Sequence, residues 1–186
     1  DGIGVAHRFA RYNANWIDIT LGNFYEQFGN GLVLRAYEER GLGYDNAIDG
    51  ALVRIKPTLG ISIKGLIGKQ RHYWDRGDGV VRGIDAEITI NDFFTKLNDS
   101  KNRITLGGSF VSKYQHDKDP LLALPENVGT TAARVNFTHG TFSINSEYAF
   151  KGQDPGSDNN YIYKKGQAFL FNTNYATKGM GLMVQY

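Results

Sequence analysis

The stretch Ile84-Asp85-Ala86-Glu87-Ile88-Thr89-Ile90 carries apolar side chains at its even positions and polar side chains at its odd positions. Successive side chains of a β-strand point to opposite faces of a sheet, whereas the faces of a helix repeat every 3.6 residues. The stretch therefore predicts a strand with one apolar face and one polar face.

The same alternation recurs along the chain, and helical spacing explains none of the segments that carry it. These segments are residues 61–67, 104–110, 134–138, 142–150 and 180–186. With the remaining apolar runs, they predict eight strands between Ala47 and Tyr186 and three earlier ones, at residues 3–11, 16–22 and 32–37. Single-chain bacterial barrels have even strand numbers, so this odd total indicates part of a larger barrel.

Short and long connections alternate between these strands. Short turns are expected at residues 56–58, 139–140 and 177–179, with a somewhat longer turn at 93–102. Long polar loops are expected at residues 71–80, 115–130 and 151–165. Short turns at one end and long loops at the other are typical of antiparallel up-and-down barrels, and especially of outer-membrane barrels, whose long loops lie outside the cell.

Strand length and mid-strand charge favour a transmembrane barrel. Many segments run for about ten residues, which matches the roughly 9–11 residues that a tilted strand needs to cross a bilayer. We expect the charged side chains in mid-strand to face a polar lumen. These candidates are Arg54, Lys64, Asp85, Glu87, Arg134 and Glu147.

A soluble barrel gives the same alternation with the charged face outside, so aromatic residues near strand ends help to choose. Such residues resemble the aromatic girdles of membrane barrels. They are Tyr73, Trp74, Phe93, Phe94, Tyr114, Phe150, Tyr161 and Tyr163. We therefore favour an all-β, transmembrane barrel over a soluble barrel or sandwich.

Composition excludes several other classes. The chain has 186 residues, no Cys, a net charge of +2 and 13% aromatic residues. The absence of Cys excludes a disulfide framework, and no apolar run approaches the ~20 residues of a membrane helix. The small net charge gives no basis for nucleic-acid binding. No change in composition divides the chain, so a single domain over residues 1–186 is expected.

The least generic segment is the glycine-rich run from Gly22 to Ala47. Its glycines suit positive φ angles or close backbone approach, for example where a segment packs inside a lumen. Its charged residues suggest a cluster inside a polar channel, or else a solvated loop. The motif residues concerned are Glu26, Arg35, Glu39 and Arg40.

This run, followed by Ile48-Asp49-Gly50, resembles a Bacteroidetes-type outer-membrane β-barrel family of unknown function. That family's run reads approximately Gly-Asp-Phe-Tyr-Glu-Gln-Phe-Gly-x-Gly-Leu-x-Leu-Arg-x-Tyr-Glu-Asp-Arg. Here Asn23 and Glu39 depart from it. The resemblance covers about 30 residues and implies an outer-membrane barrel of a Gram-negative bacterium, longer than this chain. It implies no catalytic or ligand-binding residue.

Catalytic and metal-binding motifs are absent from the sequence. There is no Gly-x-Ser-x-Gly, no His-Glu-x-x-His and no Walker-type phosphate loop. The run from His116 to Asp119 offers two carboxylates beside an imidazole, which suits a divalent cation, but a solvated loop is the favoured interpretation. Asp154 and Asp158 carry too few ligands for a calcium loop. No catalytic residue, metal or cofactor is therefore expected.

Charge pairing inside the barrel is expected instead. A hairpin at residues 139–140 brings Arg134 close to Glu147 on one face, which predicts an ion pair between them. Asp85 and Glu87 share a strand face, and Lys64 or Arg103 is expected to neutralise them. Cationic residues near that face favour anionic solutes in any pore.

The expected function is non-enzymatic. The chain is expected to be a porin-like channel or a barrel subunit of a larger outer-membrane complex. Its expected partners are outer-membrane lipid and other outer-membrane or periplasmic proteins. The alternative is a soluble or periplasmic β-sandwich or barrel that binds a glycan through Tyr73, Trp74 and Tyr163.

Overall fold

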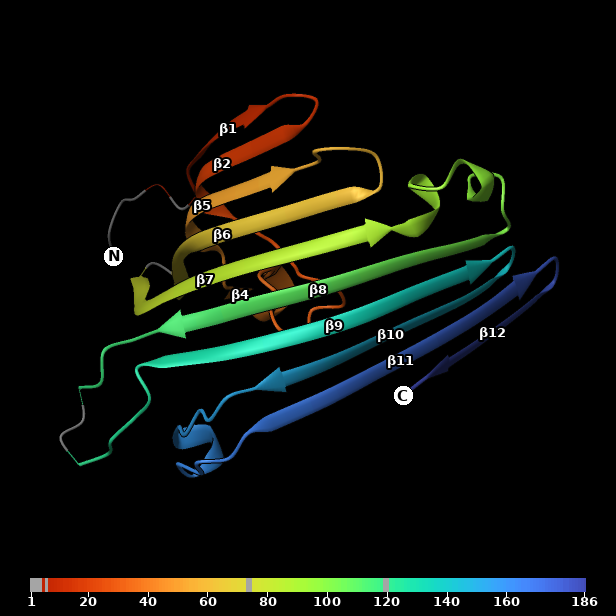
Figure 1. The fold of residues 1–186 in the computed structure, drawn as a ribbon. Coiled ribbons are helices and arrows are strands. Elements are labelled where there is room, and N and C mark those ends of the chain that lie inside the picture. The colour runs from red at the N-terminus through yellow and green to blue at the C-terminus, as the bar shows by residue number, and fades with distance from the viewer. Residues whose placement is uncertain (1–4, 6, 73–74, 119–120) are drawn as a thin grey trace.

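A sheet of ten antiparallel strands forms most of the computed structural model, which describes residues 5, 7–72, 75–118 and 121–186 (Figure 1). The strands are β1 (Phe9–Asn13), β2 (Ile17–Phe24), β5 (Ile48–Ile55), β6 (Ile61–His72), β7 (Asp75–Thr89), β8 (Asn102–Tyr114), β9 (Asn127–His139), β10 (Phe142–Lys151), β11 (Gly166–Thr177) and β12 (Met180–Gln185). The two-residue strands β3 (Glu38–Glu39) and β4 (Tyr44–Asp45) pair separately. Short 3-10 helices are η1 (Arg40–Leu42), η2 (Ile90–Asp92), η3 (Thr95–Leu97) and η4 (Ser157–Asn159).

Neighbouring strands of the sheet follow one another in the chain, in the order β1-β2-β5-β6-β7-β8-β9-β10-β11-β12. The predicted all-β, antiparallel up-and-down architecture is therefore confirmed, as are the eight strands expected after Ala47. Within the described residues β1 and β12 are the two edges and do not pair with each other. The sheet formed by these residues is thus open and does not close into a barrel.

The prediction of a long loop at residues 71–80 is wrong. Strand β6 continues to His72 and β7 begins at Asp75, with Arg71 opposite Arg76. Polar residues suggested a loop, but they pair as strands here, with a register shift between Lys69 and Arg71. Arg76 also forms an ion pair with Asp49 on β5. Polarity alone therefore does not separate a loop from a strand pair. Residues 73–74 lie outside the described part of the chain.

Residues 32–37 do not form the predicted strand of the sheet. They belong to a segment, residues 25–47, that packs against one face of the sheet and is called the covering segment below (Figure 1). Only one isolated bridge, between Gln27 and Arg35, gives this part β-type pairing. Gly29 and Gly31 take φ angles of +52° and +91°, which turn the chain back on itself, as glycine permits.

The hydrophobic core lies between the covering segment and the middle of the sheet. Phe28 is fully buried at its centre and packs over Gly83, where an added Cβ would come within 2.8 Å of the Phe28 ring. The glycine therefore makes room for the ring. The core residues are Phe24, Phe28, Ala36, Ile48, Leu52, Leu66, Val81 and Val111.

The sheet thus has two unlike faces, which we call the covered face and the open face. The covered face packs against residues 25–47 and holds both this core and buried charges such as Asp85 and Glu147. The open face carries the alternate side chains of the same strands. It is largely apolar and exposed, with Ile84 and Phe110 as examples.

Candidate functional site

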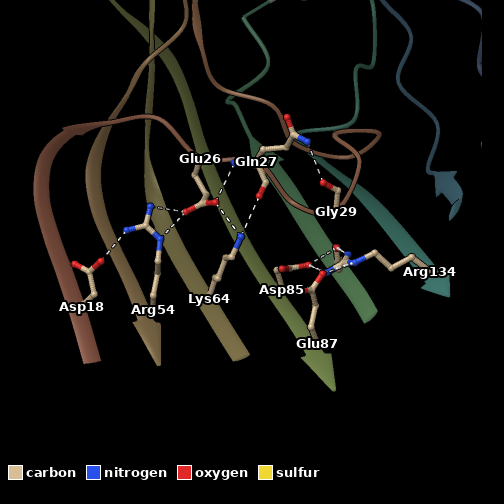
Figure 2. A network of polar contacts seen from close by, with 10 residues as sticks. Asp18, Glu26, Gln27, Gly29, Arg54, Lys64, Asp85, Glu87 and Arg134 are labelled. Atoms are coloured by element: carbon tan, nitrogen blue, oxygen red, sulfur yellow. Dashed lines mark hydrogen bonds and ion pairs between the residues drawn. The ribbon is translucent and has the colours of Figure 1, made fainter. Parts of the chain in front are cut away.

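Glu26 of the covering segment lies between two cations of the sheet (Figure 2). Arg54 Nε on β5 donates to Glu26 Oε2 at 2.9 Å, and Lys64 Nζ on β6 donates to Glu26 Oε1 at 3.0 Å. Arg54 Nη1 also donates to Asp18 on β2 at 3.1 Å, and Lys64 donates to the Gln27 carbonyl at 3.3 Å. One carboxylate of the segment therefore joins two neighbouring strands.

Arg134 on β9 is the centre of a second cluster and is almost fully buried. Its Nη2 donates to Asp85 at 2.6 Å and its Nε to Glu87 at 2.9 Å, both on β7 (Figure 2). Its Nη1 donates to Ser109 Oγ at 2.7 Å, and that hydroxyl donates to Asp85 at the same distance. Such charge-assisted bonds are the strong ones in proteins, so this cluster is fixed.

A glycine explains how Arg134 reaches across β8. Gly107 lies opposite Arg134 on one side and Glu87 on the other. A Cβ at Gly107 would come within 2.4 Å of Arg134 Nε. The bare backbone of Gly107 therefore leaves the path along which the guanidinium reaches the acids of β7.

The predicted ion pair between Arg134 and Glu147 is wrong. The two residues lie directly opposite in the register, yet Arg134 turns to the other side, toward β7. Glu147 Oε2 instead accepts two hydrogen bonds from Asn30 of the covering segment, from its backbone N–H and its side-chain amide, each at 2.7 Å. Glu147 Oε1 is buried with no hydrogen-bond partner among the described residues.

The partners expected for Asp85 and Glu87 are also wrong, although both acids are neutralised. Arg134 pairs with both of them. Lys64, which lies opposite Asp85 in the register, bonds to Glu26 instead. Arg103 pairs with Asp92 near the turn after β7. Lys64 and Arg103 thus each pair with an acid of another element, and not with the acid that strand register alone predicts.

All six charged residues proposed as lumen-facing lie on the covered face. Five of them are brought into these two groups, whereas Glu147 bonds to Asn30 of the covering segment. Whether this face lines a lumen stays a prediction. The cations near it, Arg54 and Lys64, are paired with acids. The expectation that they attract anionic solutes therefore has no support from their geometry.

Of the motif residues, Glu26 alone enters a buried cluster. Arg40 and Glu39 are exposed, with Arg40 paired to Glu38 and Glu39 accepting from the Gly41 N–H at 3.3 Å. Arg35 is exposed and stacks on the Tyr37 ring, 4.5 Å from its centroid. The later motif residues, Arg35, Glu39 and Arg40, therefore lie on a solvated surface and do not form the charged cluster that was the other interpretation.

A third polar group holds together the start and the end of the covering segment, at Tyr25 and Asp45, and sequence reasoning missed it. Tyr25 donates from its hydroxyl to Asp45 at 3.2 Å, and Arg71 on β6 pairs with the same carboxylate. Burial, followed by the charge of Asp45, raises the pKa of Tyr25 to about 12. Burial alone would raise the pKa of Asp45, but the Ala47 N–H and Arg71 outweigh it and lower that pKa below its ordinary value.

These polar groups hold the covering segment to the sheet and hold neighbouring strands together. Their carboxylates accept hydrogen bonds from fixed donors. The Ser109 hydroxyl, which donates to Asp85, is buried and also accepts from Arg134. In the described ranges, no three His, Cys, Asp or Glu side chains are arranged to hold a metal ion. His116 bonds to Glu126, and His139 lies 2.6 Å from Asn102 Oδ1. Asp119 lies outside the described residues.

No helix in the described part of the chain is long and apolar enough to span a membrane. Comparison with curated proteins and with solved structures finds no match. A family of unknown function, DUF6029, matches residues 1–186, the whole of the chain. The chain therefore belongs to the DUF6029 family.

Proposed function

We propose that this chain forms part of the wall of a transmembrane β-barrel in the outer membrane of a Gram-negative bacterium. The covering segment lies inside the barrel and fills it along β5 to β10. The barrel is non-enzymatic and acts as a membrane-embedded subunit of a larger outer-membrane assembly. An open porin-like channel is the second form of the same proposal, and the filled interior argues against it.

The observation that carries the proposal is the exposed apolar surface of the open face. Eleven of its large side chains are 42% to 61% exposed and extend over most of the sheet, from β2 to β12. They are Leu21, Ile67, Ile84, Ile88, Leu106, Phe110, Val135, Tyr148, Phe169, Leu182 and Val184. Soluble monomers rarely expose an apolar surface of this extent, whereas the hydrocarbon of a bilayer covers it.

Strand length supports the same placement. Strands β6 to β11 are 10 to 15 residues long. Strands of ordinary sheets are usually about 5–6 residues long, and a bilayer needs about 9–11. These strands are therefore long enough to cross the hydrocarbon layer at a tilt.

The charged covered face and the two unpaired edges support a closed form. Charges such as Arg134 and Asp85 belong on the inside of a membrane barrel, away from lipid. Unpaired backbone groups at a sheet edge are costly in lipid, and closure removes them. Strands beyond β1 and β12, from the same protein or a partner, would supply that closure.

The filled interior favours a subunit over an open channel. Phe28, Glu26 and Asn30 hold the covering segment to strands β5 to β10. The cations that would draw anions into a pore are paired with carboxylates. A passive channel for solutes would require the covering segment to move out of the barrel interior.

Membrane extraction of the natural protein tests the proposal. We expect it to resist alkaline carbonate, to enter a detergent phase and to migrate on gels as a heat-modifiable barrel. Ile84→Arg, on the open face, should impair membrane assembly by about 2–4 kcal/mol if it lies near the bilayer midplane. Thr141→Arg, in the exposed turn after β9, should not.

Recovery in the aqueous phase, with Ile84→Arg as well tolerated as Thr141→Arg, would overturn the membrane placement. A soluble protein that binds glycans would support the alternative instead. Of the aromatic residues proposed for that role, Tyr163 is exposed and donates to the Ala123 carbonyl. Tyr73 and Trp74 lie outside the described residues.

A further inference from the structure

A cavity of about 560 Å³ lies at one end of the covered face. It is bounded by the covering segment, by strands β6 to β10 and by two connections, one at residues 115–118 and 121–126 and the other at residues 152–165. These two connections leave the same end of the sheet (Figure 1). Leu34, Val81 and Val111 give it an apolar floor that is continuous with the core. Its size lies within the range of small-molecule sites.

The wall formed by residues 115–118 and 121–126 is held by its own hydrogen bonds. Glu126 accepts from the Asp117 N–H at 3.2 Å, and Asp117 accepts from the Leu124 N–H at 3.0 Å. Tyr163, from the other connection, donates to the Ala123 carbonyl at 3.1 Å. The two connections are therefore joined, so the cavity exists before any ligand binds.

Most charges around the cavity are already paired with each other. The ion pairs are Lys118 with Asp78 and Lys151 with Asp154, and His116 Nδ1 contacts Glu126 Oε1. Two further cations of the lining, Arg35 and Lys113, form no ion pair in the part of the chain that the structure describes. The cavity therefore offers two positive groups, from two different elements, that no carboxylate neutralises.

Both cations are well placed to receive an anion. The face of the Arg35 guanidinium rests on the Tyr37 ring, which leaves its N–H groups free in the plane for a bidentate contact. Lys113 lies on β8 between Val81 and Val128 in the register, and these three residues line the same cavity.

We propose that this cavity binds a small organic anion whose carboxylate is held by Arg35 and Lys113. The apolar floor receives the body of the ligand. The side chains of Gln70 and Gln115, also in the lining, bind its hydroxyl groups. The proposal needs only the covered face and its loops, so it does not depend on whether the open face meets lipid.

Three sugars of one ring size but different charge test this site. D-glucuronate, D-glucose and D-glucosamine are titrated by calorimetry into the full-length natural protein in nonionic detergent. We expect saturable binding of D-glucuronate, at least ~10-fold weaker binding of D-glucose and none of D-glucosamine, because charge-assisted hydrogen bonds supply the difference. Binding of D-glucuronate should weaken as salt is added.

Variants locate the binding. Arg35→Gln and Lys113→Gln should each weaken D-glucuronate binding at least ~10-fold, since each removes one charged donor. Two control variants should bind D-glucuronate like the parent, because neither residue lines the cavity. They are Arg40→Gln, in the same segment as Arg35, and Lys101→Gln, directly before the first residue of β8. Arg35 and Lys113 are both exposed, so we expect their replacement to leave the fold intact. Gel mobility with and without heating checks this.

Each contrary result overturns the proposal. These results are the absence of saturable D-glucuronate binding, equal binding of D-glucose, and equal loss in the control variants. Equal loss in the controls would mean that net charge, and not this cavity, attracts the anion.

Discussion

Strands β7 and β12 share one alternating pattern but differ in what lies over them. On the covered face, Asp85 of β7 is 2% exposed, whereas Met183 of β12, on the same face, is 67% exposed. The covering segment lies over β7 and not over β12, whose every residue is exposed. Alternation therefore decides which face a side chain occupies, and a second layer decides whether it is buried.

The chemistry of the covered face changes with that second layer. Under the covering segment it carries arginine, lysine and acids, all close to partners. Along β11 and β12 the same face is uncharged, as in Ala168, Leu170, Asn172 and Gln185. In the described part of the chain, the buried charges of the sheet lie beneath the segment, where Arg134 pairs with Asp85 and Glu147 bonds to Asn30. This suggests that sheet and segment form one stability unit.

The largest effect should come from Arg134→Ala. It leaves Asp85 buried beside Glu87 with no cation, and breaking a buried ion pair in this way costs about 3–5 kcal/mol. Asn172→Ala, on the uncovered part of the same face, should cost less than ~0.5 kcal/mol. Urea unfolding followed by circular dichroism measures both, and equal losses would mean that the covering segment does not create the difference.

Phe28→Ala should come next. The ring is fully buried between segment and sheet, and truncation of such a residue costs about 3–5 kcal/mol. Phe169→Ala, on the open face of β11 and 53% exposed, should cost about 1 kcal/mol or less in detergent. Protease sensitivity within residues 25–47 should rise in the first variant only. A segment that stays protected would show that Phe28 does not anchor it.

These two tests also mark how far sequence reasoning reaches. Period two is a local property of the chain, so strand positions and the shared face of Arg134 and Glu147 could be predicted. The partner of Arg134 could not, because it depends on the missing side chain of Gly107 on an intervening strand.

The covering segment shows the same limit. Leu32 and Leu34 alternate like strand residues, so residues 32–37 were predicted as a strand. Their true position depends on the positive φ angles of Gly29 and Gly31 and on Phe28 fitting over Gly83. A glycine in the sequence indicates freedom, but not which side chain from elsewhere will use the space.

Gly29→Ala and Gly179→Ala separate backbone strain from close contact. Both glycines have positive φ, +52° and +83°. A Cβ at Gly29 would also come within 2.6 Å of Glu147 Oε2 and 2.9 Å of Arg134 Nη1, whereas Gly179 has nothing within 4 Å. We expect a loss of about 2–3 kcal/mol for Gly29→Ala and about 1 kcal/mol for Gly179→Ala. Equal losses would mean that backbone strain alone destabilises both variants, and that the close contact of Gly29 with Glu147 and Arg134 contributes nothing.

The smallest effect tests the end of the covering segment, where burial by the sheet raises the pKa of Tyr25 to about 12 from an ordinary 10.0. Because the folded value is the higher one, the folded state holds this proton more tightly. The resulting stability is complete below pH 10 and is lost as the pH rises toward 12.

Since the side chain is partly exposed, we expect a loss of only ~1 kcal/mol across that window, read as the difference between the parent and Tyr25→Phe in urea unfolding. Asp45→Asn should reduce the loss without abolishing it, because the Asp45 charge raises the pKa less than burial does. If Tyr25→Phe loses as much stability at high pH as the parent, other groups cause the loss. The covering segment would then be less firmly buried at this end than at Phe28.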